Sequence, residues 1–323
     1  MSSYQTADVR VGLSDLLPVS QPAIEITGHW LKQARIRDEE WLPKNLLPDP
    51  VKALDDLRGD GPKADWFTFS QRCTEPEPQY SYPLEWNNEA VVRTDNYNDW
   101  WENRLPQVTR KNVRRGYKRG VRIEQAPFDD KLVQGIVQIY NETPVRQGRR
   151  FRHYGKDFDT VRRENSTYLD RSDFVAAYHQ NELIGFIKLV YVDDIARIMQ
   201  ILSLDKQADK RPTNLLIAKA VEICCSKGAS YLVFGKYVYG KKFNSPVTEF
   251  KRRNGFECVS FPSYYVPLTI KGKSAMSVKL HLGVENLIPE RLINFALGVR
   301  SKLYKATLLK SDLPGDQSRE SNL

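Results

Sequence analysis

Apolar and polar residues are regularly spaced along this chain only from Val121 onward. Val121–Ala126 alternates apolar and polar side chains as a half-buried strand does, whereas Phe128–Asn141 repeats its apolar residues with the 3.6-residue period of a helix. A second helix is expected over Lys156–Leu169. Three strands joined by short polar turns follow, and they are predicted over Asp173–His179, Leu183–Val192 and Ile195–Leu204.

Helices and strands are expected to alternate in the part that follows. Pro212 suits the first turn of a helix because proline has a fixed φ and no N–H group, and Gly228 can end that helix. The helix itself, Thr213–Lys227, is apolar on nearly every side, which predicts that it is buried. A strand, a helix and two final strands are then predicted over Ser230–Gly235, Pro246–Arg253, Phe256–Phe261 and Tyr264–Ile270.

The N-terminal part has a less regular pattern. Short strands are predicted in Ile24–Arg37, Ala64–Ser70 and Ala90–Arg93, with segments rich in Pro, Asp and Gly between them. We therefore predict an N-terminal extension or eroded half-domain over residues 1–95 and the main domain over 96–270. Residues 271–310 are expected to form C-terminal helices, and 311–323 a polar, disordered tail.

Composition is that of a globular protein. The 323 residues are 41% hydrophobic, which is enough for a core, and the four cysteines are too few for a disulfide-dense scaffold. The sequence has no apolar run long enough for a membrane-spanning helix, which needs about 18 residues or more. Its start, MSSYQTADVR, lacks the basic and apolar segments of a secretory signal. We therefore expect a cytoplasmic protein.

The net charge of +9 comes almost entirely from one segment. Arg104–Ile123 holds eight basic residues and no acidic one, so the rest of the chain has 41 basic residues against 40 acidic ones. Read as a helix from Gln107 to Arg119, it would carry two rows of like charges that repel one another. Such a helix either binds a polyanion or is a solvated face. The candidate polyanion-binding residues are Arg110, Lys111, Arg114, Arg115, Lys118 and Arg119.

The order of the predicted elements over Val121–Ile270 resembles the GNAT acyltransferase fold. Three phrases strengthen this resemblance: KNVRRGYKRGVRIEQA (Lys111–Ala126), which is similar to the Fem-type aminoacyltransferases, ELIGFIKLVY (Glu182–Tyr191) and FKRRNGFECV (Phe250–Val259). The resemblance implies an α+β fold in which helices flank a mixed, mostly antiparallel sheet. It also implies an N-acyltransferase that moves an acetyl or aminoacyl group onto an amine, such as one on a saccharide or peptide of the cell envelope.

The resemblance places the acyl donor at the loop Asp205–Asn214. In GNAT enzymes a Gly-rich turn there presents backbone N–H groups to the donor phosphates at a helix N-terminus. This loop has no glycine, and Pro212 removes one donor. Side chains would therefore have to hold the donor, which is acetyl-CoA or another acyl-CoA, or alternatively an aminoacyl-tRNA. The candidate residues are Lys206, Lys210, Arg211, Thr213 and Asn214.

Candidate catalytic residues follow from the needs of acyl transfer. The acceptor amine must lose a proton before it attacks, and the leaving group must gain one. Tyr237 and Tyr239 follow a predicted strand at the expected site, and Glu249 is a candidate base; the alternatives are packing aromatics and a surface carboxylate. The sequence has no metal motif such as HExxH or paired CxxC, so no metal site is predicted.

A second cluster of candidates lies in the basic, aromatic loop Thr143–Asp157. Arginine-rich loops suit anionic or sugar-phosphate substrates, because the guanidinium group binds such anions with two parallel hydrogen bonds. The alternative is an arginine-rich surface loop. The candidate substrate-binding residues are Arg146, Arg149, Arg150, His153 and Tyr154, together with Lys241 farther along the chain.

Two functions of different classes follow from the sequence. The first is the acyltransferase described above. The second is a non-catalytic, GNAT-shaped module that binds nucleic acid or another polyanion through the basic helix. The sequence does not identify the acyl group, the acceptor or the oligomeric state.

Overall fold

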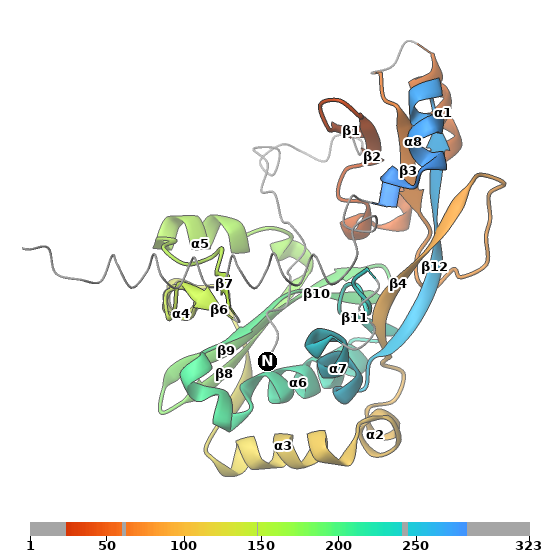
Figure 1. Ribbon diagram of the computed structural model, residues 1–323. Coiled ribbons are helices and arrows are strands. Elements are labelled where there is room, and N and C mark those ends of the chain that lie inside the picture. Colours follow the sequence, from red (N-terminus) through yellow and green to blue (C-terminus); the bar gives the residue numbers. More distant parts are fainter. Residues whose placement is uncertain (1–23, 60–62, 147, 241–244, 283–323) are drawn as a thin grey trace, which may run out of the picture.

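The computed structural model describes residues 24–282 except 60–62, 147 and 241–244. These residues form one large mixed sheet flanked by helices, as the sequence predicted (Figure 1). Among the described strands, only the pairs β2–β3 and β10–β11 are parallel. In spatial order the sheet consists of β1 (Ile24–Thr27), β2 (Gln33–Ile36), β3 (Trp66–Ser70), β12 (Glu257–Pro267), β4 (Leu84–Arg93), β11 (Tyr231–Val233), β10 (Ile195–Ser203), β9 (Glu182–Val192), β8 (Ser172–His179) and β5 (Arg122–Ala126).

The helices lie on both faces of this sheet (Figure 1). α4 and α5 lie on one side of the strands β8–β10, and α6 packs on the other side with α3 beneath it. Within the described residues, none of the helices is both long and apolar enough to span a membrane. The helices are α1 (Pro50–Arg58), α2 (Tyr97–Asp99), α3 (Gln107–Lys118), α4 (Asp130–Tyr140), α5 (Phe158–Asn165), α6 (Pro212–Ser226), α7 (Pro246–Arg253) and α8 (Ile270–Ser277).

Local sequence signals account for the elements around the main core. The Asp129 side chain accepts a hydrogen bond from the N–H group of Leu132 at 2.8 Å and thereby caps α4. α6 begins at Pro212 and is buried along most of its length, as its apolar sequence predicted. The turn Gln180–Asn181 has positive φ at both residues, which suits the tight hairpin between β8 and β9.

The C-terminal strands differ from the prediction. The expected strands Phe256–Phe261 and Tyr264–Ile270 are one strand, β12, because β12 pairs with β4 over Glu257–Tyr264 and with β3 over Ser263–Pro267. The strand that lies between β12 and β11 in the sheet is β4, which comes from the N-terminal part of the chain. Of the helices expected over residues 271–310, α8 begins at Ile270, and residues beyond 282 lie outside the described part.

The N-terminal strands continue the sheet. Ile24–Arg37, expected as strand, contains the hairpin of β1 and β2, which is followed in space by β3 and β12. These strands and α1 enclose a second core around Leu54, Phe67 and Tyr264. The predicted domain limit between residues 95 and 96 lies just after β4, and the sheet itself runs across both parts.

Candidate active site

Strand β10 is only partly paired, and its free edge lies at the centre of the molecule. It pairs with β9 from Ile195 to Ser203, but with β11 only from Ile195 to Arg197. From Ile198 to Ser203 this second edge has no strand partner among the described residues. The register with β9 also shifts between Ile198 and Gln200, which marks a bulge. Backbone groups at this edge are therefore available to a ligand.

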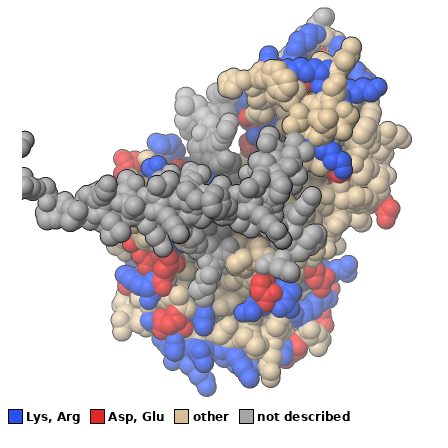
Figure 2. Space-filling view, in the orientation of Figure 1, with Lys and Arg blue, Asp and Glu red and all other residues tan. Residues whose placement is uncertain are grey.

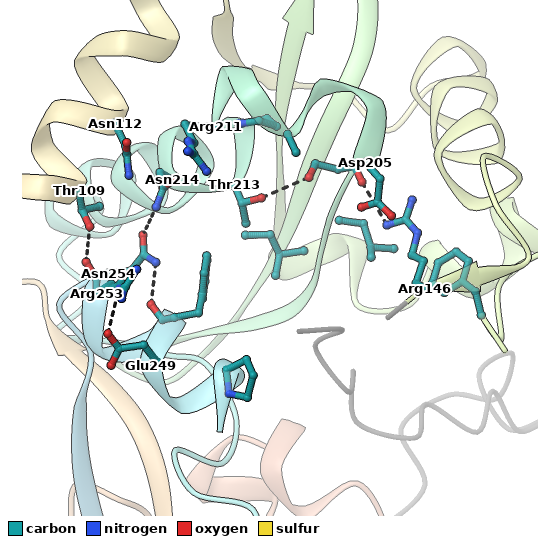
Figure 3. A pocket seen from close by; sticks show the side chains of 18 of the residues that line it. Thr109, Asn112, Arg146, Asp205, Arg211, Thr213, Asn214, Glu249, Arg253 and Asn254 are labelled. Carbon is teal, nitrogen blue, oxygen red and sulfur yellow. Dashed lines mark hydrogen bonds and ion pairs between the residues drawn. The ribbon is translucent and has the colours of Figure 1, made fainter. Parts of the chain in front are cut away.

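A cavity of about 560 Å³ lies at the end of β10 (Figure 3). The end of β10, the start of α6, α3, α7 and the small hairpin of β6 (Val145–Arg146) and β7 (Arg149–Arg150) form its walls. Thr109, Asn214 and Arg253 lie on one side of it, and Asp205 and Arg146 on the other. It therefore opens where the resemblance placed the acyl donor.

Cationic side chains dominate the walls of this cavity. Six arginines line it, against the two acids Asp205 and Glu249. Such a surface attracts an anion, and guanidinium groups suit phosphate in particular. We call this cavity the arginine cavity. Its six arginines are Arg146, Arg149, Arg150, Arg152, Arg211 and Arg253.

Three of the five predicted donor-binding residues line the arginine cavity. Arg211 has a φ of 58°, and its buried Nε atom has no partner among the described residues. The Thr213 hydroxyl lies 3.2 Å from that of Ser203, and the Asn214 amide donates to the Asn254 amide oxygen at 2.8 Å. The structure places the other two, Lys206 and Lys210, outside the lining. They pair with Glu182 at 3.1 Å and with Asp209 at 3.5 Å.

The loop before α6 presents few free N–H groups. The Glu142 carboxylate accepts hydrogen bonds from the N–H groups of Asp205 and Lys206, at 2.7 and 2.9 Å. Arg146 also donates to Glu142, at 3.0 Å. An internal carboxylate thus occupies donors that a phosphate would otherwise use, which leaves the arginine side chains as the anion-binding groups.

The candidates of the Thr143–Asp157 loop lie in different environments. Arg149 and Arg150 are exposed and line the arginine cavity, whereas Arg146 is buried and also donates to the carbonyls of Ser203 and Ile139 at 3.1 Å. Tyr154 is exposed and does not line the cavity. Lys241 lies outside the described residues.

His153 is buried in the wall of the arginine cavity. Burial, together with the neighbouring cations Lys156, Arg152 and Arg146, lowers the pKa of the imidazole to about 3. The ring is therefore uncharged in the folded protein at neutral pH. It packs against Tyr140, with the ring centres 4.3 Å apart.

We predict that His153 makes the fold sensitive to mild acid. The pKa of this group is about 3 in the folded chain and 6.5 in the reference state, so the unfolded chain binds a proton first as the pH falls. This contribution to stability is complete above pH 6.5 and is lost toward pH 3, with a slope of at most about 1.4 kcal/mol per pH unit. Urea unfolding at several pH values should show a shallower dependence in His153→Gln. Equal slopes in both proteins would contradict the prediction.

The three catalytic candidates are not brought together in one place. Glu249 lines the arginine cavity, but hydrogen bonds from Arg252 and Arg253 lower its pKa to about 2. A carboxylate with so low a pKa is a weak base. Tyr237 lines neither of the two cavities described, whereas Tyr239 lines the second one, described next. Burial raises the pKa of Tyr239, so its hydroxyl keeps its proton.

A second cavity of about 700 Å³ lies between the N-terminal strands and β10. We call it the acidic cleft after Glu39 and Glu40 of a 3₁₀ turn (Glu39–Trp41), which line it. Five cations also line it, namely Arg35, Arg72, Arg152, Arg197 and Lys236. Met199, at the bulge of β10, and Tyr239 also line it, and Arg152 lines both cavities. Sequence reasoning did not find this cleft, since its lining residues extend from Gln33 to Phe261 and carry no recognisable motif.

Helix α3 carries the basic segment and also forms part of the arginine cavity. Val108, Thr109 and Asn112 line the cavity, while Lys and Arg gather at the lower edge of the molecule, where Figure 1 places α3 (Figure 2). Two of the six predicted residues form ion pairs, Arg110 with Glu102 and Arg119 with Asp209. The other four are exposed and have no ion pair within the described residues. They are Lys111, Arg114, Arg115 and Lys118.

Among the described residues, no group of three or more His, Cys, Asp or Glu side chains is placed to hold a metal ion. No protein-family model matches the sequence, and no curated protein matches it either.

Three solved structures share the fold. The chain is similar to FemX, with a TM-score of 0.53 and 11% sequence identity over 72% of this chain and 80% of FemX. It is also similar to a C-terminal domain from Agrobacterium fabrum assigned to a lysylphosphatidylglycerol synthetase. The TM-score is 0.50 and the sequence identity 14%, over 79% of this chain and 83% of that domain. The third structure is L-PGS from Bacillus licheniformis, with a TM-score of 0.50 and 14% sequence identity over 80% of this chain and 85% of L-PGS. The chain therefore has the GNAT-like, Fem-type fold that its sequence resembled, and the similarity extends beyond Val121–Ile270.

Proposed function

We propose that this chain is an acyltransferase that moves an acyl group from an anionic donor to an amine. One observation carries the proposal: the arginine cavity and the acidic cleft adjoin the same unpaired edge of β10. Ile201, Leu202 and Ser203 of this edge line the cavity, and Met199 of the same edge lines the cleft. A donor held by arginines on one side could thus meet an acceptor from the other side at the bulge.

The chemistry at this edge would be nucleophilic attack on an ester or thioester. The amine nitrogen attacks the acyl carbonyl, and the unpaired backbone N–H groups of β10 stabilise the negative charge that develops on the oxygen. The leaving thiolate or ribose oxygen then takes up a proton. Tyr239 is the better of the two tyrosine candidates for this donation, because it lines the cleft whereas Tyr237 lines neither cavity. Burial raises the pKa of both, so both hydroxyls hold their protons at neutral pH.

The donor that fits best is an aminoacyl-tRNA, with an acyl-CoA as the alternative. The loop before α6 has no glycine turn, and Glu142 occupies its N–H groups, which disfavours a backbone cradle for pyrophosphate. The exposed cations of α3 continue the basic surface away from the arginine cavity, as a long polyanion requires. One of the similar structures is a domain assigned to a lysylphosphatidylglycerol synthetase, a name that refers to a lysyl product, and this also favours an aminoacyl group. The proposed acceptor is an amine on a saccharide or peptide of the cell envelope.

Donor binding tests the proposal. We expect a non-hydrolysable aminoacyl-tRNA analogue, and less so acetyl-CoA, to raise the thermal unfolding temperature, since a ligand at 100 times its Kd stabilises the folded state by about 2.7 kcal/mol. Arg211→Ala should reduce the shift, because Arg211 lines the cavity with an unpartnered Nε atom. Arg58→Ala, which removes an exposed arginine at the end of α1, is the matched control. If neither donor stabilises the protein, the acyltransferase proposal fails.

A further inference from the structure

Two carboxylates of the acidic cleft form no ion pair among the described residues. Glu39 and Glu40 line it, and neither forms an ion pair within 4 Å among the described residues. The Glu39 Oε1 atom accepts a hydrogen bond from the backbone N–H group of Ser70 at 2.9 Å, which fixes the carboxylate against β3. Glu40 is more exposed and adds a second negative charge on the same turn.

The cations near Glu39 are committed to other groups. Arg197 of β10 is buried and forms two hydrogen bonds with Glu89 of β4, at 2.7 and 3.3 Å. Arg72, which follows β3, donates to the carbonyl of Leu42 and lies 3.7 Å from Asp193. Tyr265 of β12 also lies near Glu39. The other titratable groups that line the cleft include Asp38, Glu40, Arg35, Arg152, Lys236 and Tyr239.

This arrangement leaves burial as the main influence on Glu39. Burial raises the pKa of its carboxyl group to about 7, although the Ser70 N–H group and Arg72 act in the opposite direction. A base is most effective when its pKa lies close to the working pH. Glu39 is therefore far better matched to neutral pH than Glu249, whose pKa is about 2.

The cleft also has donors that call for a ligand. Arg72 is nine-tenths buried and lines the cleft, and its Nε and Nη1 atoms have no partner among the described residues. Buried polar groups are nearly always hydrogen-bonded, and one without a partner is destabilising. An acceptor that brings both an ammonium group and an oxygen atom would satisfy the carboxylates and the guanidinium together.

We propose that Glu39 takes the proton from the ammonium group of the acceptor in the acidic cleft, and this inference rests on the proposed acyl transfer. One N–H bond of the ammonium breaks, and an O–H bond forms on the Glu39 carboxylate. The freed electron pair attacks the acyl carbonyl, and the bond from the acyl carbon to the leaving sulfur or oxygen breaks. The leaving atom takes the second proton that the nitrogen loses as the amide forms.

Two amines of different charge test this role. Transfer by the full-length protein, from whichever donor stabilises it, is measured to n-butylamine, which is an ammonium ion at pH 7, and to hydroxylamine, which is not. We expect Glu39→Gln to lower kcat with n-butylamine by roughly 10²–10⁴-fold and to leave kcat with hydroxylamine nearly unchanged. Glu39→Asp should restore part of the n-butylamine rate. Glu257→Gln, a change at an exposed residue of β12 that lines neither cavity, is the matched control.

A structural role would give a different result, because it would lower the rates with both amines equally. That outcome would overturn the inference, as would an unchanged rate with n-butylamine. The Glu39 carboxyl can also be followed by NMR in ¹³C-labelled protein, with Glu39→Gln used for assignment. A titration close to pH 7 is expected, and one near pH 4.5 would overturn this inference alone. A wild-type protein that binds donor but transfers to neither amine would overturn the proposed function as well.

Discussion

Replacing Glu89 with alanine should lower the free energy of unfolding by about 3–5 kcal/mol, because it leaves a buried charge without its partner. Glu89 is 7% exposed and Arg197 is 5% exposed, and their side chains are joined by two hydrogen bonds. The pair links β4 to β10 past the end of β11. Although burial opposes it, the Arg197 guanidinium holds the pKa of Glu89 below its ordinary value.

The matched control is an exposed pair of the same composition. Arg35 and Glu25 form an ion pair at 2.8 Å on the surface, where such pairs contribute about 0–1 kcal/mol. Urea unfolding should therefore show a much smaller loss for Glu25→Ala than for Glu89→Ala. The double change Glu89→Leu with Arg197→Leu should recover stability, since apolar groups of similar volume often replace a buried pair without loss. Equal losses in the two single variants would contradict this view of the pair.

The Glu89–Arg197 pair joins residues of two strands that are 108 positions apart in the sequence, and such distant neighbours explain why the full sheet was not predictable. Strands β8, β9 and β10 are joined by tight turns, so the residues that pair are close in sequence, and the turn residues Gln180–Asn181 and Asp193 signal the hairpins. Strand β4 pairs with β11 and β12, which follow it by about 140 residues or more. Periodicity reports which face of a strand is buried, but it does not report which strand lies beside it.

The two cavities also differ in how far their residues could be predicted from the sequence. Arg211, Thr213 and Asn214 were predictable because the proline that starts α6 fixes their place at a helix N-terminus. Arg149 and Arg150 stand out as a local cluster of charge. Glu39 has no such local signal. Its importance depends on Ser70, Arg72 and Arg197, which only the folded chain brings around it.

Removing the four unpaired cations of α3 should abolish most of the salt dependence of RNA binding. Lys111, Arg114, Arg115 and Lys118 are exposed, and alanine is compatible with the helix and removes the repulsion between neighbouring like charges. Each lost phosphate contact lowers the slope of log K against log salt by about 0.9. The quadruple alanine variant should thus lose about 3 to 4 units of slope, and its affinity for tRNA at low salt should fall by roughly 10²-fold.

The control must remove the same charge from another face of the molecule. Lys52 and Arg58 of α1, Lys63 of the loop before β3 and Lys273 of α8 are exposed. Their quadruple alanine variant has the same net charge as the α3 variant, so an equal loss of affinity would mean that only the overall charge attracts RNA. If α3 alone sets the slope, the helix is a directed phosphate-binding surface. Equal binding of tRNA and of its aminoacyl analogue through α3, with no effect of Arg211→Ala, would then favour the non-catalytic module, because contacts on α3 hold the polyanion but transfer requires the acyl end to reach the unpaired edge of β10.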